Sequence, residues 1–204
     1  MIHKKLLALA LVAATSPAFA SSAFTVDFEK TWDFSNGDVN DYYNGGTAAD
    51  GTSGANLGVS FVGVSGLSND ALGPYYSNAP SSQGVAYAHD TAFMNVASGV
   101  DNNLTFWYSS AAVVAGAVTA WTGLNGTGDL LGSFDLAANG TYDNWTQTTF
   151  SFTGTAQSFN LTTAALNNVA FDIISSVPVP AAAWLFGTGL AMFGAVRRRG
   201  KASV

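Results

Sequence analysis

The sequence predicts an all-β protein whose body is an antiparallel β-sandwich or barrel. Short runs of β-branched and aromatic residues alternate with clusters of Gly, Asn, Asp and Ser, as in small antiparallel sheets. Within the runs, apolar residues recur at every second position: Leu104, Phe106 and Tyr108 share one face of a strand, and Phe150 and Phe152 share a face of another. No window of the body has the apolar period of an amphipathic helix.

The expected strands are the runs that combine this alternation with β-favouring residues. In chain order they include 24–28, 57–64, 103–109, 112–122, 130–136, 145–152, 157–161 and 169–174. Turn-forming pairs such as Asn36-Gly37, Asn125-Gly126 and Asn139-Gly140 fall between them. The segment 36–56 is rich in Gly, Asp, Asn and Thr, so we expect a long surface loop there.

The N-terminal segment has the three parts of a secretory signal peptide. Two lysines precede an apolar run at 6–14, and a small-x-small site follows at Ala18 and Ala20. The run is shorter than the roughly 20 residues that span a bilayer. We therefore expect a signal peptide at 1–20, cleaved to leave Ser21 as the first residue. A short N-terminal membrane anchor is the alternative.

Charge is distributed unevenly along the chain. All 13 acidic residues lie between Asp27 and Asp172, where Lys30 is the only base, so this stretch has a net charge of −12 (13 acids against one base). Such a body repels a phosphate backbone, which argues against nucleic acid as a partner. The chain has no cysteine, which excludes disulfides, zinc–thiolate sites and thiol catalysis.

The segment 177–204 differs from the body, which we place at 21–176. Its first four residues are stiff and extended, because each proline fixes its own φ angle and restricts the residue before it. They are Val177, Pro178, Val179 and Pro180. An uncharged apolar run follows at 181–196, and with these four residues it is about as long as a bilayer is thick.

The flanks of this run indicate its orientation in a membrane. Trp184 lies near its start, where interfacial aromatic residues are favoured, and Arg197, Arg198 and Arg199 close it. Arginines favour the cytoplasmic side, so the body is expected on the outer side. The tail therefore predicts one transmembrane helix at about 181–196. A permanent tail anchor is the alternative to a removable one.

The tail resembles the PEP-CTERM sorting signal over residues 177–199, with a Pro-x-Pro motif, a glycine-interrupted apolar stretch and an arginine cluster. The resemblance implies export through the Sec translocon, cutting near the motif by a membrane-embedded exosortase, and release to the cell surface or extracellular matrix. Such proteins are typical of Gram-negative bacteria that make extracellular polysaccharide and biofilm. Val179 stands where the family's namesake motif has glutamate, and an exosortase that reads the glutamate would leave this tail as an anchor.

The body is also similar to jelly-roll carbohydrate-binding modules in two short segments, Asp27-Phe28-Glu29 and Phe171-Asp172-Ile173. In those modules, acidic residues near both termini often share a structural calcium ion. The resemblance therefore implies that Asp27, Glu29 and Asp172 bind calcium, which prefers hard oxygen ligands. The alternative is that these are solvated carboxylates at strand ends.

No catalytic residue is expected. His89 is the only histidine of the body, and no G-x-S-x-G turn, P-loop or dinucleotide motif is present, so we interpret His89 as an ordinary surface residue. Aromatic rings that could stack on a sugar are more numerous. They are Tyr42, Tyr43, Tyr75, Tyr76, Trp107 and Trp121.

The sequence therefore predicts a non-enzymatic, exported surface or biofilm-matrix protein. A carbohydrate-binding module retained in extracellular polysaccharide is the alternative. A secreted hydrolase is the third hypothesis, and the scarcity of His, Lys and Arg in the body argues against it.

Overall fold

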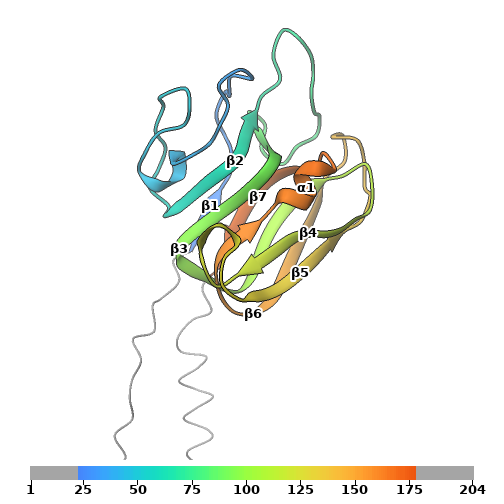
Figure 1. Cartoon of the computed structure of the whole chain (residues 1–204). Helices are drawn as coiled ribbons and strands as arrows, with labels where there is room; N and C mark the ends of the chain where they lie inside the picture. The colour runs from blue at the N-terminus through green and yellow to red at the C-terminus, as the bar shows by residue number, and fades with distance from the viewer. Residues whose placement is uncertain (1–22, 178–204) are drawn as a thin grey trace, which may run out of the picture.

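The computed structural model describes residues 23–177, which form a protein of seven strands with very little helix. The strands are β1 (Phe24–Val26), β2 (Val59–Leu67), β3 (Val85–Ser109), β4 (Val114–Trp121), β5 (Leu130–Leu136), β6 (Thr146–Asn160) and β7 (Ala170–Ser176). Two 3-10 turns, η1 (Tyr42–Asn44) and η2 (Leu124–Gly126), and one short helix, α1 (Thr162–Leu166), complete the fold (Figure 1). Every pairing between these strands is antiparallel, which confirms the predicted all-β, antiparallel class.

The long strand β3 organises the sheet. The strand order is β1-β7-β3-β6-β4-β5, and β2 pairs separately with β3. Phe171 in β7 pairs with Ala86 near the start of β3 and also with Tyr108 near its end. A strand residue has one neighbour on each side, so β7 lies between the two ends of β3. The sheet therefore curls back on itself around one interior.

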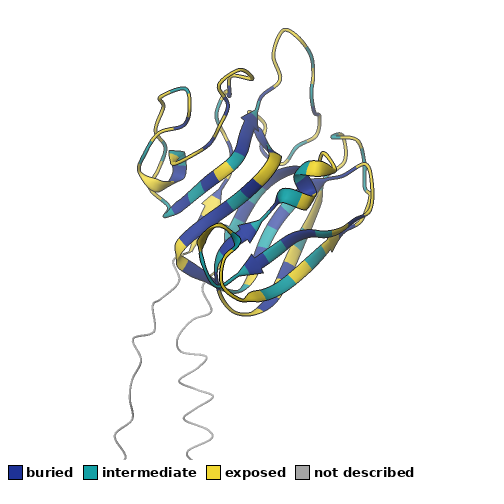
Figure 2. Ribbon diagram, viewed as in Figure 1, coloured by how far each residue is buried: buried dark blue, intermediate teal, exposed yellow. Residues whose placement is uncertain are grey.

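Aromatic side chains fill that interior. Phe106, Phe150 and Phe159 are each at most 1% exposed, and the Phe106 ring meets the ring of Phe134 at 6.1 Å and that of Phe171 at 5.7 Å. Edge-on aromatic contacts of this kind stabilise a core beyond the area that they bury. Buried and exposed positions alternate along much of the strands (Figure 2).

The predicted strand boundaries are correct in part. The runs expected at 145–152 and 157–161 are one continuous strand, β6, and β3 begins at Val85 rather than at residue 103. The predicted surface loop at 36–56 is wrong in one respect. Val39 is fully buried and Tyr43 is 4% exposed, because this segment folds over the sheet and adds side chains to the core.

The ends of the described chain lie together. Phe24 in β1 pairs with Ser176 in β7. Between residues 23 and 177, no helix is long and apolar enough to cross a membrane. Several expected features lie outside the described residues: the signal peptide at 1–20, Ser21, the helix at 181–196 with Trp184, and the arginines at 197–199. Of the expected sorting motif at 177–180, only Val177 is described.

Candidate functional site: a tyrosine-lined cleft

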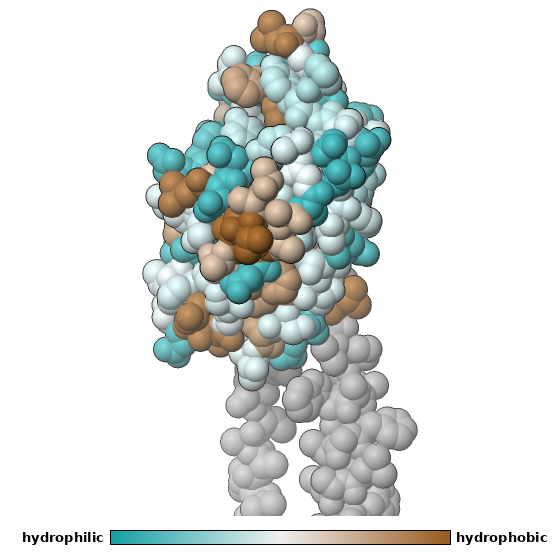
Figure 3. Space-filling view, turned by 90° about the vertical axis from the view of Figure 1, so that its right-hand side faces the viewer, coloured by the Kyte–Doolittle hydropathy of each residue, from teal (hydrophilic) through white to brown (hydrophobic). Residues whose placement is uncertain are grey.

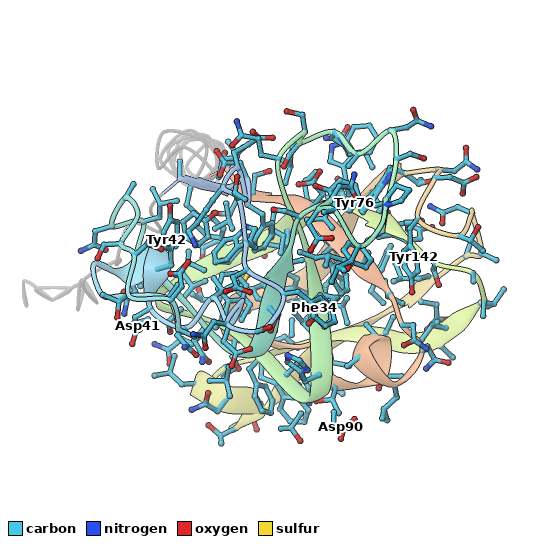
Figure 4. All side chains as sticks on the ribbon, turned by 90° about the horizontal axis from the view of Figure 1, so that it is seen from above. Phe34, Asp41, Tyr42, Tyr76, Asp90 and Tyr142 are labelled. Carbon is cyan, nitrogen blue, oxygen red and sulfur yellow. The ribbon has the colours of Figure 1, made fainter. Side chains whose placement is uncertain are left out.

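Aromatic rings from several segments surround a cavity of about 240 Å³ at one end of the β2–β3 ladder. We call it the tyrosine-lined cleft. It is lined by Phe34, Leu67, Tyr75, Tyr76, Val85, Tyr87, Ala88, Tyr142, Asn168 and Ala170. Seen from above, Phe34, Tyr76 and Tyr142 approach the same region from different loops (Figure 4). Pockets for drug-sized ligands measure about 300–1,000 Å³, so this cleft suits a smaller group such as one or two rings.

At the rim of the cleft two aromatic rings stack on each other, and we call this pair the platform. The rings of Phe34 and Tyr75 are nearly parallel, with centroids 5.8 Å apart and an interplanar angle of 13°. Phe34 is 55% exposed, although a phenylalanine of this size is usually buried when the core can accept it. The platform thus presents apolar surface to solvent beside the cleft.

One asparagine fixes the backbone of both neighbouring tyrosines. The Asn69 Oδ1 accepts hydrogen bonds from the backbone N–H of Tyr75 at 2.7 Å and of Tyr76 at 3.2 Å, and its Nδ2 donates to the Tyr76 carbonyl at 2.9 Å. The Trp145 Nε1 donates to the Ser77 carbonyl at 3.0 Å. The loop at 68–84 therefore holds its two tyrosines in a defined position.

Two carboxylates hold the far end of the same loop. The Asp172 Oδ2 accepts from the Ser81 backbone N–H at 2.7 Å, and Glu29 accepts from the backbone N–H groups of Ser82 and Gln83. Asp172 is fully buried, and burial raises its pKa to about 6. Its hydrogen bonds from Ser81 and Ile173 oppose this rise, whereas the negative charge of Glu29 adds to it.

The predicted calcium ligands lie at this loop. Glu29 and Asp172 meet adjacent residues of it, and the Asp27 Oδ1 accepts from the Glu29 backbone N–H at 3.2 Å. Within residues 23–177, no three His, Cys, Asp or Glu side chains are grouped so that they could hold a metal ion. The structure thus uses these carboxylates as acceptors for backbone donors, and calcium binding stays a prediction from the sequence.

His89 lies on β3 in a small polar cluster. Its Nε2 is 2.7 Å from the Ser65 Oγ and 3.4 Å from the Asp38 Oδ1, and the Ser65 hydroxyl also bonds to Asp38. In a hydrolytic triad the serine and the acid contact different ring nitrogens, whereas here both contact Nε2. Ser65 is also only 3% exposed. The cluster therefore links a loop to two strands, and its geometry differs from that of a triad.

The structure brings together only some of the aromatic residues singled out from the sequence. Tyr75 and Tyr76 line the cleft. Tyr43 is buried against Phe28, with ring centroids 6.0 Å apart. The remaining three, Tyr42, Trp107 and Trp121, are half-buried at other places in the fold.

Three aromatic residues of the cleft were not expected from the sequence: Phe34, Tyr87 and Tyr142. Phe34 lies between polar residues that favour turns. An aromatic ring in such a segment is the one sequence feature that could have indicated a site there. Tyr87 and Tyr142 carry no comparable local signal.

Comparisons with known proteins give distant likenesses. No family model and no curated protein sequence matches the chain. Among solved structures, the K2 cleaved adhesin domain of Lys-gingipain is similar with a TM-score of 0.47 and 14% identity, over 76% of this chain and 99% of that one. The C-terminal CBM6 of LamC, a marine laminarinase from Zobellia galactanivorans, is similar with a TM-score of 0.33 and 14% identity, over 56% of this chain and 88% of that one.

Proposed function

We propose that the body is a non-catalytic carbohydrate-binding domain on a jelly-roll-like β-sandwich scaffold, and that the tyrosine-lined cleft is its binding site. The observation that carries the proposal is the stacked pair of an exposed Phe34 and a half-buried Tyr75 beside three further tyrosines. A sugar ring has apolar C–H faces and a rim of hydroxyls. Phenol side chains match both features, since each has an apolar ring and a polar tip.

Charge narrows the class of sugar. In the described part of the chain, Lys30 is the only Lys or Arg. It forms an ion pair with Asp50, and its Nζ lies 4.2 Å from the centre of the Trp32 ring. No Lys or Arg lines the cleft to pair with a uronate or sulfate group. The net charge of the body also repels anionic chains. The proposed ligand is therefore a sugar without acidic groups, and a neutral sugar is the case to test.

The position of the cleft fits a surface role. Ala170, at the start of β7, lines the cleft, and Ser176 ends the same strand roughly 20 Å away at 3.3 Å per residue. The segment resembling a sorting signal follows Ser176 directly. With export by the segment 1–20 and anchoring or processing at 177–199, the cleft would point away from the membrane and towards the polysaccharide outside.

A packing role in the matrix without any sugar ligand is the alternative function. An array of neutral oligosaccharides, probed with the full chain in a mild detergent, separates the two. We expect binding to at least one oligosaccharide, and we expect Phe34→Ala to weaken it at least tenfold because half of the platform is lost. Tenfold corresponds to about 1.4 kcal/mol.

The matched control is Leu72→Ala. Leu72 is 85% exposed on the loop that carries Tyr75, and it is not part of the cleft. This variant should bind like the wild type. Equal affinity of Phe34→Ala and wild type would remove the cleft as the binding site, and an array without signal would favour the packing role.

A further inference from the structure

A second hollow lies at the other end of the β2–β3 ladder. It has a volume of about 690 Å³, and its walls come from η1 and the loop around it, the start of β2, the middle of β3, and η2. We call it the asparagine groove. It is lined by Asn40, Asp41, Asn44, Thr47, Ala48, Gly58, Ser60, Phe61, Val62, Asn95, Ala97, Leu124 and Asn125. Figure 4 shows Asp41 on the opposite side of the molecule from Tyr142.

Paired amides build one wall of the groove. The Asn95 Nδ2 donates to the Asn125 Oδ1 at 2.8 Å, and the Asn125 backbone N–H donates to the Asn95 Oδ1 at 2.8 Å. Asn95 is only 8% exposed, so its amide is held at the base of the groove. Among the described residues, nothing pairs with the Asn125 Nδ2 donors, which leaves them available to a ligand.

The opposite wall is held by backbone geometry. Asn40 has a φ angle of +46°, and its carbonyl accepts from the Phe61 backbone N–H at 2.8 Å. Left-handed backbone is tolerated by asparagine better than by most other residues. The Asn44 Nδ2 lies 3.3 Å from the Asp41 Oδ1. Loop and strand are thus fixed to each other, so the groove is formed before any ligand enters.

The chemistry of these walls differs from that of the cleft. The polar lining consists of amides, hydroxyls and one carboxylate, Asp41, without any base. Amides both donate and accept hydrogen bonds, which matches the hydroxyls and ring oxygens of a sugar chain. Asp41 and the acidic body disfavour anionic polymers. The volume lies within the range for ligands larger than a single ring.

The register of the β2–β3 ladder sets the distance between the two sites. Ser60, which lines the groove, is paired with Asn95, whereas Leu67, which lines the cleft, is paired with Val85. The two positions are seven residues apart along β2, roughly 23 Å at 3.3 Å per residue. One sugar chain of several units, or two separate chains, can therefore reach both sites.

We propose that the asparagine groove is a second carbohydrate site, which binds a linear segment of a neutral polysaccharide through its asparagine amides. This site acts separately from the tyrosine-lined cleft, and either proposal can fail without the other. With two sites on one body, a single copy of the protein cross-links neighbouring chains of a polysaccharide.

The test uses the full chain in a mild detergent and four neutral probes: maltohexaose, cellohexaose, xylohexaose and N-acetylchitohexaose. The groove variant is Asn44→Ala/Ser60→Val, which removes one amide and one hydroxyl. Its matched control is Gln147→Ala/Thr153→Val, which removes the same two groups from exposed positions of β6.

Calorimetric titration should show at least tenfold weaker binding of one hexasaccharide in the groove variant and wild-type binding in the control. If the double variant unfolds early, Asn44→Ala alone gives the same comparison.

The cleft variant Phe34→Ala separates the two proposals. Loss of hexasaccharide binding in the groove variant, with binding retained in Phe34→Ala, supports the groove. Loss only in Phe34→Ala overturns the groove and leaves the cleft as the binding site. Equal binding by all variants, or no binding of any of the four probes to the wild type, also overturns the groove proposal.

Discussion

At the scale of single residues, the cleft depends on a few polar side chains that do not line it. Asn69 fixes the backbone of Tyr75 and Tyr76, and Asp172 holds the end of the same loop through Ser81. A buried carboxylate is costly when it is charged, unless donors surround it. Asp172 has two backbone donors, yet its pKa is still raised to about 6. Its charge state is therefore coupled to the stability of the fold.

This coupling predicts a pH dependence. The pKa of Asp172 is about 6 in the folded protein, against an ordinary value of 3.8. Between pH 3.8 and pH 6, the folded protein therefore binds this proton more tightly than the unfolded chain does. The stabilisation by the protonated group is complete below pH 4 and is lost as the pH rises through 6, an effect on the order of 2–3 kcal/mol. Thermal unfolding followed from pH 4.5 to 7 should therefore show a decline that Asp172→Asn removes.

Asp90→Asn is the control for this measurement. Asp90 is exposed on β3, at the edge of the molecule, and the substitution removes the same charge (Figure 4). Asp172→Asn should also lower stability at every pH, because the amide turns a donor towards an N–H group. The slope with pH is thus the informative quantity. An Asp172→Asn slope equal to that of wild type and Asp90→Asn would show that another group titrates.

At the scale of elements, β2 bends at a bulge between Val62 and Val64, where the register with β3 shifts. Gly63 occupies this position with a φ angle of +60°, and a Cβ there would lie 1.9 Å from the Thr91 carbonyl oxygen. The backbone angle is strained for most larger residues, and the close approach leaves no room for a Cβ. The bend that joins the groove end of β2 to the cleft end therefore depends on this glycine.

We predict that Gly63→Ala is strongly destabilising. Gly51→Ala is a matched control, because Gly51 has a φ angle of +81° and open space around it, so only the backbone strain remains. We expect Gly63→Ala to lose roughly 1–3 kcal/mol more than Gly51→Ala, the usual effect of overpacking. Urea unfolding measures both. Equal losses would mean that β2 shifts freely at the bulge.

The strands also show which parts of the fold can be predicted from the sequence. β5 was predicted with its observed bounds, because its turns and β-favouring residues are local. The first part of β3 was missed, because its inward positions are small alanines, such as Ala86 and Ala88, and His89-Asp90 interrupts the apolar pattern. That two predicted runs form the single strand β6 could not be predicted from the local sequence either, because Gly154 between them is typical of a turn.

The site was harder to predict than the elements. Tyr75 and Tyr76 were candidates because they are adjacent aromatic residues in a polar segment. Phe34 and Tyr142 join them only through long-range pairing of strands and loops, which the sequence does not specify locally. The groove was missed for the same reason, because an asparagine in an Asn-rich chain gives no signal until its neighbours in space are known.

At the scale of the whole molecule, the face of the body and the position of its two ends can be described together. The outer face turned towards the viewer in Figure 3 is mainly polar, with apolar side chains in small separate patches. The ends of the body pair with each other through Phe24 and Ser176. Both segments that flank the body therefore leave it from neighbouring points, and cutting them would disturb none of the described strands.

This arrangement leads to a prediction about processing. We expect the mature protein to begin at Ser21 and to end near Pro178–Ala181, because the small-x-small site and the Pro-x-Pro motif lie just outside the paired ends of β1 and β7. The intact mass of protein released from the cell surface tests both ends at once. Pro178→Ala/Pro180→Ala should leave the chain at full tail length in the inner membrane, as should deletion of the host's exosortase. Pro74→Ala, a proline change within the body, should be processed normally. A surface form that still carries Arg197–Arg199 would show that the protein stays anchored by its tail.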